Sequence, residues 1–139
     1  MKTQQQRQKV KIKVQPATKY IIEMYRAYGA AGQPTIEEVK QAIQEYHTAG
    51  KQNKNELAYL NDLLAIATVM ERLEAEEKGQ DIKVIIQATY MQMRDTKRGT
   101  ITDTVSKASI KHYIGEATVY RYLKQARIMA AEEKGLRIF

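Results

Sequence analysis

Apolar residues recur along most of the chain at the three- and four-residue spacing of amphipathic helices. Seven glycines fall between these periodic stretches and are expected to mark where helices end. The pattern therefore predicts a mainly α protein. Residues 9–14 alternate lysine with β-branched side chains, which is a strand pattern but equally fits a flexible basic arm at this length. Pro16 is expected to end that stretch.

Two helices are predicted before residue 50. The first runs from Tyr20 to about Gly29, where apolar side chains crowd into a few positions. The second has a clear start, because the Thr35 hydroxyl can accept from the backbone N–H three residues on while Glu38 reaches back, a capping box. This helix is expected to end before Gly50.

A long third helix is expected over residues 56–78. It carries two overlapping apolar stripes, which indicate contact on two sides. One stripe contains Leu57, Leu60, Leu64 and Ala67, and the other contains Leu63, Ile66, Met70 and Leu73. Two explanations are equally good. Either one side packs within its own domain and the other against a partner subunit, or the helix is central within a single monomer.

Three further helices are expected, over residues 82–93, about 102–110 and 116–133. The last has one apolar side on a helical wheel, made by Val119, Tyr122, Leu123, Ala126 and Ala130. Its other side is mostly polar. A short helix, a turn that contains Gly115 and a long helix with a polar outer side together form the pattern of a helix-turn-helix unit. The fold is therefore expected to be a helical N-terminal region followed by a C-terminal helix-turn-helix DNA-binding unit.

The charge distribution points to an anionic partner. The chain carries a formal net charge of +7. Residues 1–19 hold six basic and no acidic side chains, residues 20–80 have a net charge of −4, and residues 81–139 have a net charge of +5. Two basic ends around an acidic middle are expected if the ends contact an anion, although a membrane surface has the same sign as nucleic acid. A basic surface that is only solvated is the alternative.

The polar side of the last helix carries residue types that suit a DNA-reading helix. Arg121 and Lys124 lie one turn apart, and Arg121 can form two hydrogen bonds with a guanine edge. Tyr120 can contact a thymine methyl group or a phosphate, and lysines of the preceding helix can hold phosphates. The candidate DNA-binding residues are Lys107, Lys111, His112, Glu116, Ala117, Thr118, Tyr120, Arg121, Lys124 and Gln125. The alternative is an amphipathic terminal helix in a bundle, with its basic side merely solvated.

Other chemistry has little support. The chain has no cysteine, and its two histidines, His47 and His112, are far apart, so neither a metal site nor a bound cofactor is expected. Ser106 and Ser109 have no base and orienting group near them, so the protein is not expected to be an enzyme. No stretch resembles a signal peptide or a membrane span, which predicts a cytoplasmic protein without membrane association.

Residues 114–126, Ile-Gly-Glu-Ala-Thr-Val-Tyr-Arg-Tyr-Leu-Lys-Gln-Ala, resemble the recognition segment of helix-turn-helix units similar to sigma-factor region four. With the long helix over residues 63–73 and the helix from Ile82 to Tyr90, the layout resembles the RinA/ArpU-like regulators of phages of Gram-positive bacteria. The resemblance covers residues 81–136, and residues 56–78 only in layout. It implies a sequence-specific activator of phage late genes in the bacterial cytoplasm, a homodimer or higher oligomer, and a contact with the host RNA polymerase. Gly115 departs from such segments, which commonly have a Ser or Thr cap, so the last helix is expected to start at Glu116 with weaker capping or after a longer turn.

These patterns divide the chain into three parts. Residues 1–19 are predicted to be a basic arm, residues 20–79 a helical oligomerisation or interaction region, and residues 80–139 the DNA-binding domain. Two other functions stay open. One is a phage packaging adaptor similar to a small terminase subunit, in which the DNA-binding unit usually comes first. The other is a protein-interaction module whose acidic middle binds a host polymerase or repressor.

Overall fold

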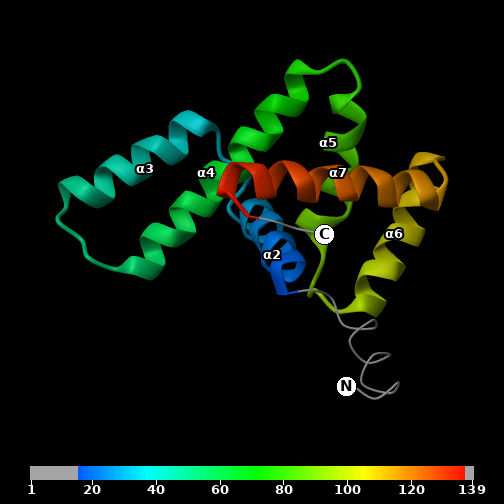
Figure 1. The fold of residues 1–139 in the computed structure, drawn as a ribbon, viewed down its shortest axis with the longest axis horizontal. Coiled ribbons are helices and arrows are strands. Elements are labelled where there is room, and N and C mark those ends of the chain that lie inside the picture. Colours follow the sequence, from blue (N-terminus) through cyan, green and yellow to red (C-terminus); the bar gives the residue numbers. More distant parts are fainter. Residues whose placement is uncertain (1–15, 137–139) are drawn as a thin grey trace, which may run out of the picture.

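The computed structural model describes residues 16–136, and within this range the chain is helical, with no β-strand (Figure 1). The helices are α2 (Pro16–Ala30), α3 (Ile36–Thr48), α4 (Lys54–Ala75), α5 (Gly79–Ala88), the 3-10 helix η1 (Tyr90–Gln92), α6 (Arg98–His112) and α7 (Glu116–Lys134). The prediction of a mainly helical fold is confirmed. The predicted strand or arm at residues 9–14 lies outside the described residues, as does most of the predicted basic arm.

Local sequence signals account for several helix ends. Pro16 is the first residue of α2, where a missing N–H and a fixed φ are tolerated. The stretch that Pro16 is expected to end lies outside the described residues. The capping box before α3 is present as predicted, with the Thr35 hydroxyl 3.1 Å from the backbone nitrogen of Glu38. Helix α4 begins two residues earlier than predicted, because the Asn53 side chain accepts from the N–H groups of Asn55 and Glu56.

The predicted helix over residues 82–93 is interrupted. Helix α5 ends at Ala88, and Thr89 leaves the helical region with φ −119° and ψ −89°. The Thr89 hydroxyl donates to the carbonyl oxygen of Ile85 at 2.6 Å, and its N–H donates to the carbonyl of Ile86. These two bonds tighten the helix end, and only a single 3-10 turn follows.

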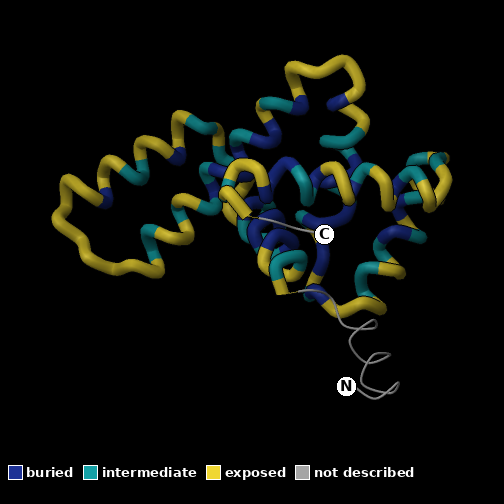
Figure 2. The backbone as a smooth tube through the Cα atoms, in the orientation of Figure 1, coloured by how far each residue is buried: buried dark blue, intermediate teal, exposed yellow. Residues whose placement is uncertain are grey.

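One hydrophobic core joins the two halves of the described chain. Its buried side chains come from α2, α4, α5, η1, α6 and α7, with Val39 from α3 (Figure 2). Helix α7 packs against α2, α4, α5 and α6. The C-terminal half of α4, from Leu63 to Leu73, is buried against elements of its own chain. For this half, the two apolar stripes are explained by a helix that is central within the monomer.

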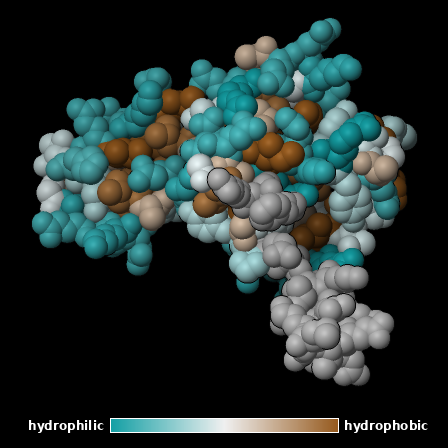
Figure 3. All heavy atoms as spheres, in the orientation of Figure 1, coloured by the Kyte–Doolittle hydropathy of each residue, from teal (hydrophilic) through white to brown (hydrophobic). Residues whose placement is uncertain are grey.

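The α3–α4 hairpin projects from this core. Helix α3 packs mainly against the N-terminal half of α4, and the pair extends away from α5, α6 and α7 (Figure 1). The apolar seam of the hairpin is unevenly covered: Val39 and Tyr46 of α3 are buried, whereas Ile36, Ile43, Leu60 and Leu64 are only partly buried. Figure 3 shows apolar atoms gathered along this seam, between polar outer sides. The hairpin is thus a projecting pair of helices whose apolar side chains are incompletely buried.

Close backbone contact fixes where α5 begins. A Cβ atom on Gly79 would overlap the carbonyl oxygen of Leu73 in α4, and it would lie 2.7 Å from the carbonyl carbon of that residue. Only glycine fits at this junction without a shift of the backbone. The short connection after α4 therefore folds α5 back tightly against it.

Ion pairs and hydrogen bonds anchor the C-terminal half of α7. Arg72 of α4 contacts Glu132 and Glu133 at 3.1 and 3.0 Å, and Lys134 contacts Asp62 at 2.8 Å. Inside the core, the Tyr25 hydroxyl donates to the carbonyl oxygen of Ala126 at 2.7 Å. Helix α7 is therefore held by α2 and α4. None of the helices within residues 16–136 has the length and apolar character needed to cross a membrane.

Candidate nucleic-acid interface

A three-residue turn joins α6 to α7. Tyr113 follows α6 in the left-handed region, with φ 55° and ψ 41°. The carbonyl oxygen of Ser109 accepts from the N–H of Ile114 at 3.2 Å, and the Ser109 hydroxyl donates to the carbonyl oxygen of Ile114. Helix α7 begins at Glu116, and Gly115 supplies no side-chain cap. The expected start with weak capping is confirmed.

Helix α7 has one buried and one exposed side, as the helical wheel predicted. Four of the five apolar-side residues are at most 1% exposed, namely Val119, Leu123, Ala126 and Ala130, and Tyr122 is half-buried. On the other side Glu116, Ala117, Tyr120, Arg121, Lys124 and Gln125 are exposed, and Thr118 is half-buried. Tyr120 is 42% exposed. The small, fully buried alanines let α7 approach its neighbours closely, while the polar candidates face solvent.

The cations of this exposed side are available to a ligand. Arg121 and Lys124 form no ion pair or hydrogen bond with any residue in the described range. They lie three positions apart on one helix, so their side chains project from neighbouring turns. The nearest exposed acid along the helix is Glu116, at its first turn, where the helix dipole favours a negative charge. The exposed side of α7 can therefore offer hydrogen-bond donors to an anionic surface.

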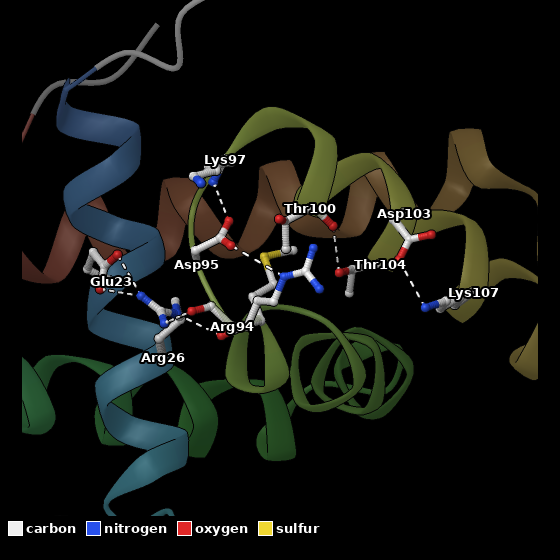
Figure 4. Close-up of polar contacts among 10 residues, drawn as sticks. Glu23, Arg26, Arg94, Asp95, Lys97, Thr100, Asp103, Thr104 and Lys107 are labelled. Atoms are coloured by element: carbon white, nitrogen blue, oxygen red, sulfur yellow. Dashed lines mark hydrogen bonds and ion pairs between the residues drawn. The ribbon is translucent and has the colours of Figure 1, made fainter.

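Two candidate lysines lie on a different part of the surface. Lys107 and Lys111 of α6 line a groove of about 270 Å³ with Ala88 and Gln92 of the preceding segment. Lys107 also pairs with Asp103 one turn earlier at 3.0 Å, in a contact that is largely exposed (Figure 4). Exposed pairs of this kind are weak, so the Lys107 ammonium can exchange Asp103 for another anion. The contact of Lys107 and Lys111 with phosphates stays a prediction.

His112 turns inward at the end of α6. Its Nε2 atom is buried and has no hydrogen-bond partner among the described residues. The side chain lines a pocket of about 220 Å³ with Asp81, Ile114 and Tyr122, between α5 and the turn. A phosphate contact through Nε2 would require another side-chain conformation. The sequence holds no signal for this orientation, because it depends on how α5 packs under the turn.

The start of α6 is tied to α2, a feature that the sequence patterns do not reveal (Figure 4). The Arg26 guanidinium donates to the carbonyl oxygens of Met93 and Arg94 at 2.8 and 2.5 Å, and it pairs with Glu23 at 2.7 Å. These contacts fix the segment that leads into α6. Arg26 and Met93 are far apart in sequence, so periodicity along either helix cannot predict the contact.

Asp95 organises the same junction. Its carboxylate accepts from the N–H of Lys97 at 2.9 Å, just before the first turn of α6. A hydrogen bond from Thr100 and the one from the backbone of Lys97 hold the pKa of the Asp95 carboxyl below its usual value. The charged carboxylate thus stabilises the N-terminal end of α6, where no side chain of the capping residue does so.

The described residues contain no group of three or more metal-ligating side chains that could hold a metal ion. No protein-family model, curated protein or solved structure matches this chain. The resemblance to the RinA/ArpU-like regulators therefore rests only on the residues that carry it, and it stays a hypothesis.

Proposed function

We propose that this chain binds double-stranded DNA and regulates transcription, with α7 as the helix that enters the major groove. The observation that carries the proposal is the exposed side of α7, where Arg121 and Lys124 have no ion-pair partner among residues 16–136, on a helix whose opposite side is buried. A helix with this division can lie in a groove of about 12 Å width without exposing apolar side chains.

Each exposed residue type suits a part of the duplex. The Arg121 guanidinium can donate two hydrogen bonds to the O6 and N7 atoms of guanine, and Gln125 can pair in the same way with adenine. Lys124 can reach a phosphate or a guanine edge. Gly115 and Ala117 are small, so the backbone of the first turn can approach the bases. Arg121 is therefore the residue proposed to read sequence, and Lys124 mainly contributes charge.

The anchoring of α7 supports this role because a reading helix must be held in place before it meets DNA. Tyr25 bonds the backbone of Ala126, and Arg127 donates to the hydroxyl of Tyr90 at 2.8 Å. The Tyr25 contact lies on the side of α7 opposite Arg121 and Lys124, whereas the half-buried Arg127 lies one turn after Lys124. Binding then costs little ordering of the backbone, and the exposed side chains keep a defined direction.

We also keep the homodimer or higher homo-oligomer as part of the proposal. The α3–α4 hairpin supports it, because a two-helix arm with a half-covered apolar seam gains burial when a second hairpin completes a four-helix arrangement. Mass measurement in solution tests this. A dimer favours a regulator on a palindromic site, whereas a ring of many subunits favours the packaging adaptor. Contact with the host RNA polymerase is a further part of the proposal.

The main experiment selects bound sequences from a random DNA pool and then compares affinities on the selected and a scrambled duplex. Arg121→Ala should weaken binding to the selected duplex by about 1–3 kcal/mol and change binding to the scrambled one little. Lys124→Ala should weaken both and lower the salt slope by about 0.9. Lys40→Ala, which removes a charge from exposed α3, is the matched control and should change neither.

Absence of DNA binding at low salt would contradict the proposal and favour the protein-interaction module. Equal losses from Arg121→Ala on both duplexes would make Arg121 a phosphate contact rather than a reader of bases. If Lys40→Ala lowers affinity as much as Lys124→Ala, binding is a general effect of positive charge and α7 has no special role.

A further inference from the structure

Tyr113, in the turn between α6 and α7, has an unusual combination of properties. Its side chain is 94% exposed, so it buries almost no surface on the protein. Its backbone is left-handed, with φ 55° and ψ 41°, a conformation that glycine adopts at lower cost than tyrosine. The hydroxyl makes no hydrogen bond with a described residue. Among residues 16–136, no contact therefore explains a tyrosine at this position.

The place of Tyr113 relative to α7 is fixed. Tyr113 and Glu116 are three positions apart, so the Cα atom of Tyr113 lies within about 11 Å of that of the first residue of α7. Its own N–H donates to the carbonyl of Ile110 at 3.4 Å, and the next residue, Ile114, is bonded to Ser109 on both its N–H and its carbonyl. Ile114 is also partly buried against the core. The exposed phenol thus projects from a turn that is held on both sides.

We infer that the Tyr113 hydroxyl donates a hydrogen bond to a DNA phosphate at the edge of the major groove when α7 lies in that groove. The inference rests on the proposed function. A helix that enters the groove by its N-terminal end brings the preceding turn to the phosphates along the groove edge. Tyrosine hydroxyls are among the groups that bind phosphate oxygens, and such contacts set the position of the protein without reading sequence.

The neighbouring side chains favour DNA over a protein as the partner. Lys111, two residues earlier, is exposed, and no ion pair within the described range neutralises it. Ile110 is also 74% exposed and would suit an apolar protein surface, so a protein partner is the competing outcome of the test. A tyrosine hydroxyl carries no charge, and this separates its contribution from that of a lysine.

The experiment measures affinity, salt slope and thermal midpoint for Tyr113→Phe and Tyr113→Gly. Both variants should bind about tenfold more weakly, equally on the selected and the scrambled duplex, because a bond to a charged phosphate is lost. The salt slope should stay unchanged, since a neutral phenol releases no counterion, whereas Lys111→Ala should lower it by about 0.9. Tyr113→Gly should melt at the same temperature as the parent chain or higher.

Gln33 provides a matched control for the backbone effect. It is exposed, has φ 55° and lies in the turn between α2 and α3. Gln33→Gly makes the same kind of backbone change but should leave DNA affinity unaltered.

Wild-type affinity in both Tyr113 variants would overturn the inference and leave the proposed function intact, provided that Arg121→Ala behaves as expected. Loss in Tyr113→Gly with normal binding by Tyr113→Phe would overturn it too, because the ring rather than the hydroxyl would then make the contact. If Tyr113→Gly fails to fold, Tyr113→Phe alone decides. Absence of DNA binding by the parent chain would remove both the function and the inference.

Discussion

The junction between α4 and α5 allows a sharp test of the packing that supports α7. Gly79→Ala places a Cβ atom into the backbone of Leu73, and the atoms that it meets cannot rotate away, as the end of a flexible side chain could. Overpacking usually costs 1–3 kcal/mol, and contact with backbone belongs at the upper end, so we expect a loss of about 2–3 kcal/mol. This is a large share of the roughly 5–15 kcal/mol that stabilises a typical domain.

Gly99→Ala is the matched control for this substitution. Gly99 is the second residue of α6, and a Cβ atom there would meet nothing within 4 Å. Its φ is not positive, so alanine fits the backbone and restricts the unfolded chain. We expect a gain of about 0.5 kcal/mol. The same chemical change should therefore have opposite signs at the two positions.

Urea denaturation followed by far-ultraviolet circular dichroism measures both effects, provided that the slope with denaturant is unchanged between variants. A thermal midpoint roughly 10 °C lower is expected for Gly79→Ala from the same free-energy loss. Equal stability of Gly79→Ala and the parent chain would refute the reasoning, because it would mean that α5 does not approach α4 as closely as described. A loss of similar size in Gly99→Ala would show that alanine is disfavoured for a reason other than backbone contact.

Two tyrosines give further predictions. Tyr25→Phe removes the buried hydrogen bond to Ala126, and we expect a loss of about 1–2 kcal/mol in urea denaturation; no loss would mean that this bond does not hold α7 to α2. Desolvation, together with the hydrogen bond and the charge of Asp62, raises the pKa of Tyr20 from its ordinary 10.0 to about 12. The folded state therefore favours the neutral phenol. The contribution of Tyr20 to the free energy of unfolding is complete below pH 10.0 and is lost as the pH rises through about 12. In Tyr20→Phe, the loss of stability that Tyr20 causes at alkaline pH should disappear. Denaturation at several pH values measures this, and the same pH dependence in the variant and the parent chain would refute the role of Tyr20.

The sequence alone was sufficient for the features that depend on neighbouring residues. The capping box of Thr35 and Glu38 and the start of α7 after Gly115 involve bonds within one turn, so their residue types suffice to predict them. The orientation of α7 was predictable for a similar reason. An apolar stripe at helical spacing must turn toward the core, which leaves Arg121 and Lys124 on the opposite side.

Other features required the three-dimensional packing. The two stripes of α4 fit a partner subunit or a central position equally well, and only the contacts of Leu63–Leu73 with the chain's own helices decide for that half. Periodicity likewise did not predict three other features. These are the buried orientation of His112, the end of α5 at Thr89 and the hydrogen bonds of Arg26 to the segment before α6. Helical repeats describe which side of a helix is buried, but not which distant segment covers it. That choice depends on contacts between residues far apart in the chain, and so it is made only when the whole core assembles.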